Sequence, residues 1–212
     1  MSITNGYCDL PDIKQALTIN DEGDNVELEL SVEVASRQID NQCGPGRRFW
    51  QDSTVVARTY YPSEARRVFV DDISTVTGLI VKVDQDDDGT FETTLTINTD
   101  FIVEPVNAAA QFPVEPYTSI RLLDGALSSF MALSSGRPHV QVTAKFGWSA
   151  VPQAIKRATI LQARQVFKAI QTQNGLLQQT VDGSVVRMPV IDSTARLSIE
   201  PFIRYLEVDD GA

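Results

Sequence analysis

One long segment with helical periodicity, residues 25–43, most constrains the fold of this chain. Its apolar residues recur at spacings of four, three, four and four, which places them on one stripe of an α-helix: Leu28, Val32, Ala35, Ile39 and Cys43. Asp24 precedes the segment and can cap its first turn. Gly44 and Pro45 end it, because Gly tolerates a left-handed residue and Pro cannot continue the helix. The pattern predicts an amphipathic helix that packs in a core.

A second helical segment, residues 152–174, carries apolar residues in two directions around its axis. A helix whose apolar surface is this wide usually has contacts on two sides. One side can pack on the 25–43 helix, and the other can pack on the strands or on a neighbouring subunit. For this second side we predict a subunit interface that contains Ile160, Phe167 and Ile170.

Between these helices, over residues 52–148, the hydrophobic pattern changes from a helical to a strand period. Short runs rich in Val, Ile, Thr, Phe and Tyr are separated by Pro, Gly, Asp and Ser clusters, as is typical of strands. We predict about six strands, with RVFVDDI and GLIVKVD as separate ones, in an antiparallel β-sandwich or open barrel. The fold class is therefore α+β, with a helical core of two to three helices from residues 1–51 and 149–175 and a β insertion at 52–148.

The C-terminal residues 176–212 are predicted to form a hairpin around Gly183, followed by a short docking segment. The apolar residues of that segment are Ile199, Phe202, Ile203, Tyr205 and Leu206. Because so short a helix is marginal in water, the segment must pack on a partner protein or on its own helical core.

The net charge of −10 bears on possible partners. An acidic chain repels nucleic-acid phosphates, so we do not expect it to adhere broadly to DNA. The two cysteines, Cys8 and Cys43, form no CxxC or Cys/His cluster for zinc and are read as small buried hydrophobes, with a thiol pair still possible. The sequence has no basic-then-apolar leader and no apolar run of about 18 residues, so we expect no membrane contact.

Few residues suggest catalysis or metal binding. His139 is the single histidine, and no neighbouring nucleophile marks a Ser/His/Asp triad, so we expect no enzyme activity. Asp84, Asp86 and Asp88 match the start of a Ca²⁺ loop, but position twelve, which needs a bidentate Glu, is Leu95. We therefore predict an acidic hairpin turn without metal or cofactor.

Arg47 and Arg48 form a basic pair in an acidic chain. They are either solvated loop charges or contacts with an acidic partner surface or with DNA phosphate in a channel. Of the two contacts, we favour the acidic partner surface.

Four segments occur in an order that resembles the head-to-tail adaptor (connector) proteins of long-tailed bacteriophages, in the form with a β insertion. They are YCDLPDIKQAL at 7–17, VASRQIDNQCGPGRRFW at 34–50, FGWSAVPQAIKRATILQARQVFKA at 146–169 and IDSTARLSIEPFIRYL at 191–206. Each motif alone is only weakly specific for this family, whereas the four motifs in the same order are more specific. They lie in the helical parts, which make up about half of the chain.

The resemblance implies a structural virion protein of the neck, assembled in the host cytoplasm. Identical subunits, typically twelve, would form a ring beneath the portal protein. The ring would continue the channel through which DNA passes without sequence-specific contacts. The docking segment would bind the portal, and the opposite face would receive the next neck or tail protein.

Two other functions compete with this one. The first is another neck component, a head-closure or tail-completion protein, whose expected fold is dominated by strands and lacks long flanking helices. The second is a carbohydrate- or receptor-binding β module on a helical stalk, which would need a shallow aromatic site. Trp50 and Trp148 stand instead at the two ends of the insertion, where packing accounts for them better.

Overall fold

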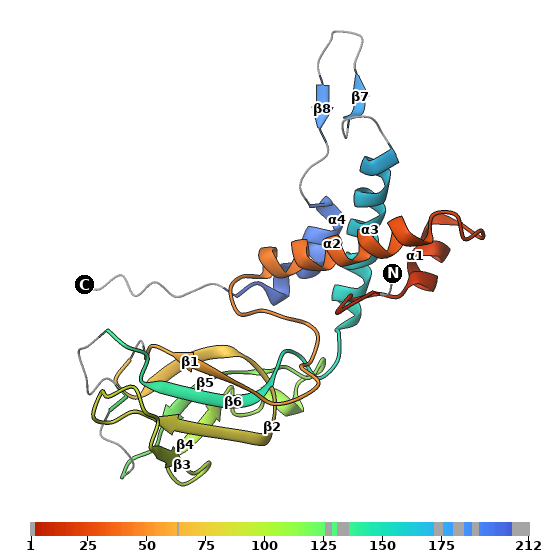
Figure 1. The fold of residues 1–212 in the computed structure, drawn as a ribbon. Helices are drawn as coiled ribbons and strands as arrows, with labels where there is room; N and C mark the ends of the chain where they lie inside the picture. The colour runs from red at the N-terminus through yellow and green to blue at the C-terminus, as the bar shows by residue number, and fades with distance from the viewer. Residues whose placement is uncertain are drawn as a thin grey trace. The chain divides into compact units, whose positions relative to one another are not determined.

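The computed structural model describes residues 3–62, 64–125, 129–130, 136–171, 176–179, 185–187 and 191–204. The chain divides into two compact units, one of residues 1–45 with 151–212 and one of residues 46–150 (Figure 1). The first unit contains the helices and the second an antiparallel sheet. The predicted α+β class is therefore confirmed.

The helical unit contains α1 (Leu10–Leu17), α2 (Asn25–Cys43), α3 (Gln153–Gln171) and α4 (Ser193–Ile199), with a short 3₁₀ turn, η3 (Glu200–Phe202), after α4. Helix α3 packs against α1, α2 and α4 (Figure 1). The predicted stripe of α2, from Leu28 to Cys43, is fully buried, since it faces this packing. A hairpin of β7 (Leu176–Gln179) and β8 (Val185–Arg187) follows α3, as the sequence predicts.

The helix starts differ in how they are capped. The Asp24 side chain makes no capping hydrogen bond to α2, so the predicted side-chain cap is wrong there. The Asp192 carboxylate does cap α4, accepting hydrogen bonds from the backbone of Thr194 at 2.9 Å and of Ala195 at 3.0 Å. At α1, the backbone N–H of Asp9 donates to the Asp12 carboxylate at 3.0 Å, which satisfies a donor at the start of the helix.

The β unit is one open sheet in the order β1-β6-β2-β5-β4, with β3 paired to β2. The strands are β1 (Val56–Tyr60), β2 (Arg67–Val83), β3 (Thr93–Leu95), β4 (Phe101–Glu104), β5 (Tyr117–Leu122) and β6 (Val140–Phe146), and a 3₁₀ turn, η1 (Ala108–Ala110), joins β4 to β5. All ladders are antiparallel. A single continuous sheet agrees with the open-barrel alternative better than with a two-sheet sandwich.

Strand β2 corrects the predicted strand pattern. The segments RVFVDDI and GLIVKVD are one strand rather than two. Register shifts against β6 lie between Ile73 and Thr75 and between Thr75 and Ile80, and Gly78 has a φ of +79°. Such irregularities bend a strand and disrupt its alternation locally, which is why the polar residues between the two segments resemble a loop.

The sheet buries one face of alternating side chains. Along β6 the pattern alternates strictly, with Val140, Val142, Ala144 and Phe146 buried. In the helical unit, Cys8 and Cys43 are both buried, and burial raises the pKa of the Cys8 thiol to about 12. Among the described residues, no helix is both long and apolar enough to cross a membrane.

Candidate functional site

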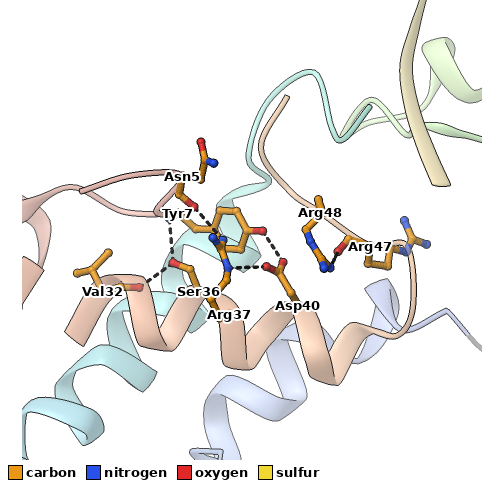
Figure 2. A network of polar contacts seen from close by, with 8 residues as sticks. All are labelled: Asn5, Tyr7, Val32, Ser36, Arg37, Asp40, Arg47 and Arg48. Atoms are coloured by element: carbon orange, nitrogen blue, oxygen red, sulfur yellow. Dashed lines mark hydrogen bonds and ion pairs between the residues drawn. The ribbon is translucent and has the colours of Figure 1, made fainter. Parts of the chain in front are cut away.

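A network of polar contacts holds the N-terminal segment against α2 (Figure 2). Asp40, which is 1% exposed, accepts hydrogen bonds from Tyr7 Oη and, at 2.9 Å, from Arg37 Nε. Arg37 Nη2 donates to the carbonyl oxygen of Asn5 at 2.9 Å, and the Tyr7 backbone donates to Ser36 Oγ at 3.2 Å. The network ties residues 5–7 to the second half of α2 and so acts as a structural anchor.

Arg47, predicted to contact an acidic partner or DNA, pairs instead with a carboxylate inside the β unit. Arg47 Nη1 lies 3.3 Å from Asp72 Oδ2, and the two side chains are 14% and 0% exposed. Trp148 Nε1 donates to the same oxygen at 3.0 Å, and the Trp148 ring packs on Phe49 with centroids 5.3 Å apart. Its charge is matched by this buried carboxylate, and the contact of Arg47 with an acidic partner or with DNA stays a prediction.

The two ends of the β unit meet beside this pair. The backbone N–H of Asp52 donates to the carbonyl of Phe146 at 2.8 Å. Gly147 has a φ of +99°, and a Cβ built on it would lie 1.7 Å from the carbonyl oxygen of Trp50. Only Gly fits such a close approach of two backbones. The GRRFW and FGW motifs thus close the β unit, and buried Trp148 offers no surface to a sugar.

Arg48 is half-buried and lines a cavity of about 250 Å³ together with Trp50, Asp52, Arg58 and Asp71. Arg58 forms ion pairs with Asp71 at 2.6 Å and with Asp52 at 3.3 Å. Arg48 Nη1 donates to the Arg47 carbonyl at 2.5 Å (Figure 2). The acidic lining is paired to Arg58, and the partner contact of Arg48 stays a prediction.

The three predicted subunit-interface residues lie in different environments on α3. Phe167 is 2% exposed and packs in a cluster with Cys8, Ile13 and residues of α2. Ile160 is partly buried against the same cluster, whereas Ile170 is 51% exposed. Phe167 has no surface to offer a neighbour, because α1 and α2 cover it. Of the three residues, Ile170 has the exposure that the prediction needs.

The predicted portal-docking segment is also divided. Ile199 is fully buried in the helical unit, where it packs on its own subunit, and its contact with the portal stays a prediction. Phe202 and Ile203 are partly exposed. Tyr205 and Leu206 lie outside the described residues.

A second apolar stripe on α2 was missed in the sequence. Val26, Leu30 and Val34 are 56%, 46% and 36% exposed. Their spacing of four places them together on the face opposite the buried stripe. The sequence carries this signal as apolar residues on two faces of one helix, but the sequence-based prediction for this helix rests on the core stripe alone.

The loop between β2 and β3 brings together the residues of the Ca²⁺-like motif. Asp84 is buried, Asp86 and Asp88 are exposed, and the carboxylates of these three and of Glu92 offer ligand atoms within 4.8 Å of one another. His139 is 4% exposed and stands directly before β6, close to the predicted strand start.

No family model matches the chain, and no curated protein matches it either. Solved structures do match. One is a chain from the neck of an empty gene transfer agent (GTA) particle computed with C6 symmetry, with TM-score 0.54 and 17% identity over 98% of this chain and 95% of that one. Another is from the virion of a native GTA particle, with TM-score 0.53, 18% identity and the same coverage. A third is from the neck of a native GTA particle computed with C12 symmetry, with TM-score 0.50, 17% identity and the same coverage. The chain therefore has, over nearly its whole length, the fold of a protein found in these particles.

Proposed function

We propose that the chain is a structural subunit of the neck of a phage-like particle, and within the neck a head-to-tail adaptor. Copies form a ring of twelve that joins the portal protein to the next neck or tail protein. The observation that carries the proposal is the shared fold with chains of GTA particles, two of them in neck structures, over 98% of this chain. The order of the four adaptor-like motifs supports it independently. The proposed role requires no catalysis.

The ring is proposed to form through the exposed apolar stripe of α2, which consists of Val26, Leu30 and Val34. Contiguous apolar residues on a surface usually mark an interaction site. A ring needs a head-to-tail contact between two different patches of the same subunit, and Ile170 of α3 is the candidate for the second patch. The C6 and C12 symmetries used for the GTA necks support a ring with such contacts.

The portal contact is proposed for the chain after α4. Phe202 and Ile203 are partly exposed, and Tyr205 and Leu206 extend the same apolar sequence. Leu197 adds an apolar residue of α4 that is 70% exposed. Apolar side chains with a tyrosine are the kind enriched in the cores of protein interfaces.

The DNA channel is proposed to pass through this ring without specific contacts. The chain is acidic, with a net charge of −10, and like charges prevent the phosphate backbone from adhering. Arg48 is then assigned to an acidic surface of the next neck or tail protein rather than to DNA.

Completion of tailless heads tests the proposed role. Purified protein is added to portal-bearing heads from particles that lack it, followed by tails, and tailed particles are counted by electron microscopy. The full chain restores tailed particles, and a chain that ends at Arg204 does so poorly, because it lacks Tyr205 and Leu206. Binding to isolated tails but not to heads would instead favour a tail-completion protein and contradict the adaptor role.

A further inference from the structure

A second cluster of side chains lies in the β unit, and its residues belong to none of the surfaces assigned above. Asp84 follows β2 directly and His139 precedes β6 directly. The last residues of the ladder, Val83 and Val140, pair with each other, and the Asp84 N–H donates to the His139 carbonyl at 3.0 Å. The sheet itself thus holds these two residues side by side.

The imidazole of His139 has an unsatisfied nitrogen. The side chain is 6% exposed, and its buried Nδ1 has no hydrogen-bond partner among the described residues. Its neighbour Asp87 Oδ1 lies at 3.9 Å, too far for a hydrogen bond. Buried polar atoms are nearly always satisfied, so an exception calls for an explanation. Two ligands of a tetrahedral metal ion, each about 2.0–2.2 Å from it, lie about 3.3–3.6 Å apart, so a shift of a few tenths of an ångström would bring these two atoms to that separation.

Asp84 presents a third ligand atom. Its carboxylate oxygens accept hydrogen bonds from the N–H groups of Asp87 at 2.8 Å and of Gly89 at 2.9 Å. These two hydrogen bonds fix the carboxylate in place, as partners in an outer shell fix a metal ligand.

The loop folds Asp87 back toward the other two residues. Asp87 adopts a left-handed conformation with φ of +63°. One ligand atom each from Asp84, Asp87 and His139 then lie within 4.8 Å of one another. The exposed carboxylates of Asp86 and Asp88 add negative charge nearby, and the guanidinium of Arg137, which donates to the Asp87 carbonyl at 3.2 Å, offsets part of it.

We propose that Asp84, Asp87 and His139 bind one divalent transition-metal ion of the Zn²⁺ class, which fastens the β2–β3 loop to the start of β6. An imidazole nitrogen with two carboxylates suits Zn²⁺, Co²⁺ or Ni²⁺, whereas Ca²⁺ and Mg²⁺ prefer oxygen ligands alone. The Ca²⁺-like motif in the sequence shares Asp84 with this site but uses Asp86 and Asp88 in place of Asp87 and His139.

Calorimetric titration of the full, untagged, chelator-treated chain tests the site. Zn²⁺ is the probe, and Ca²⁺ is titrated separately. The wild type binds one Zn²⁺, and Asp87→Asn and His139→Gln each weaken binding by at least about 10-fold, the loss typical even for outer-shell changes. Asp88→Asn is the matched control, because it removes the same charge from the same loop and leaves binding within about 3-fold.

Circular dichroism of the metal-free variants keeps folding separate from binding. The Asp87 side chain is on the loop and 18% exposed, so Asp87→Asn retains the wild-type fold and decides the question even where His139→Gln does not fold. Three results would overturn the proposal: no Zn²⁺ binding to the wild type, equal losses in Asp87→Asn and Asp88→Asn, or preferential Ca²⁺ binding that depends on Asp88.

Discussion

The backbone N–H of Arg204 donates a hydrogen bond of 2.7 Å to the carbonyl oxygen of Cys43. This bond fastens the chain after α4 to the C-terminal end of α2. Beside it, Gly44 has a φ of +102°, and a Cβ at this position would lie 2.7 Å from the Arg204 carbonyl oxygen. The chain up to Arg204 therefore packs as part of the helical unit.

Replacement of Gly44 by Ala is expected to destabilise the helical unit. The unfavourable φ costs about 1–3 kcal/mol, and the contact with the Arg204 carbonyl adds to that cost. Gly136→Ala is the control, since Gly136 has a φ of +79° but a Cβ added there would meet no atom of the described residues within 4 Å. Urea denaturation measures both variants, and equal losses would show that the contact with the tail has no energetic weight.

Ile199 and Leu197 offer a comparison within one helix. Ile199 is fully buried and Leu197 is 70% exposed. Ile199→Ala is expected to lower the free energy of unfolding by about 2–5 kcal/mol, and Leu197→Ala to change it by about 0.5 kcal/mol or less. If Ile199→Ala were as mild as Leu197→Ala, α4 would not belong to the core in solution.

Asp72→Ala is expected to be among the most damaging changes in the β unit. It leaves the buried Arg47 guanidinium without its carboxylate, which costs about 3–5 kcal/mol. Asp71→Ala is the control, because the Asp71 side chain is 29% exposed and a surface pair contributes about 1 kcal/mol or less. Denaturation monitored by tryptophan fluorescence measures both variants, and similar losses would contradict the importance of the buried pair.

Local periodicity made part of this fold predictable. The stripe from Leu28 to Cys43 could be read directly, because a helix repeats its pattern over neighbouring residues, and all of it is buried. The sequence predicts two strands in place of β2, because the register shifts and Gly78 interrupt the alternation of apolar and polar residues. Nothing nearby in the sequence distinguishes Asp72 from Asp71, although the first is buried and the second partly exposed.

The partners of each apolar face were harder to infer. Phe167 and Ile199 lie on apolar stripes that periodicity detects, but a stripe does not say what covers it. Within the subunit α1 and α2 cover Phe167, and α4 brings Ile199 onto the same helical unit. His139 and Asp84 meet only through the pairing of β2 with β6, which depends on the register of distant strands.

The ion pair between Lys156 and Asp12, 2.8 Å long, predicts a pH-dependent stability. Although burial opposes its ionisation, the Lys156 hydrogen bond holds the pKa of Asp12 below its ordinary value. Asp12 in turn raises the pKa of Lys156. Because the pKa of Asp12 is lower in the folded protein than its unfolded value of about 4, ionised Asp12 stabilises the folded state above about pH 4. This stabilisation is lost as pH falls through the folded-state pKa. Because the pKa of Lys156 is raised, charged Lys156 stabilises the folded state below about pH 10. This stabilisation is lost as pH rises through the folded-state pKa of Lys156.

Lys156→Met should therefore reduce stability at pH 7 by about 1 kcal/mol or less, since both side chains are partly exposed. The difference from the wild type should shrink toward pH 3. Arg157→Met, which removes the same charge from an exposed position of α3, is the control. A difference between Lys156→Met and wild type that stayed constant from pH 7 to about pH 3 would show that the pair contributes nothing.

The proposed ring depends on a contact through the apolar stripe of α2. Leu30→Asp places a charge in the middle of this stripe, where burial against a neighbour would leave the charge unpaired and costly. Leu30 is 46% exposed in the single subunit, so the variant should fold normally. Gln42→Asp is the control, because it adds the same charge at an exposed polar position of the same helix.

Native mass spectrometry of the protein with the portal of its particle tests the ring. We expect a complex with twelve copies of the wild type and of Gln42→Asp, and loss of that complex with Leu30→Asp while circular dichroism remains unchanged. If each portal subunit instead bound one copy without contacts between copies, Leu30→Asp would form the same twelve-copy complex as the wild type. That result would contradict the ring interface proposed for α2.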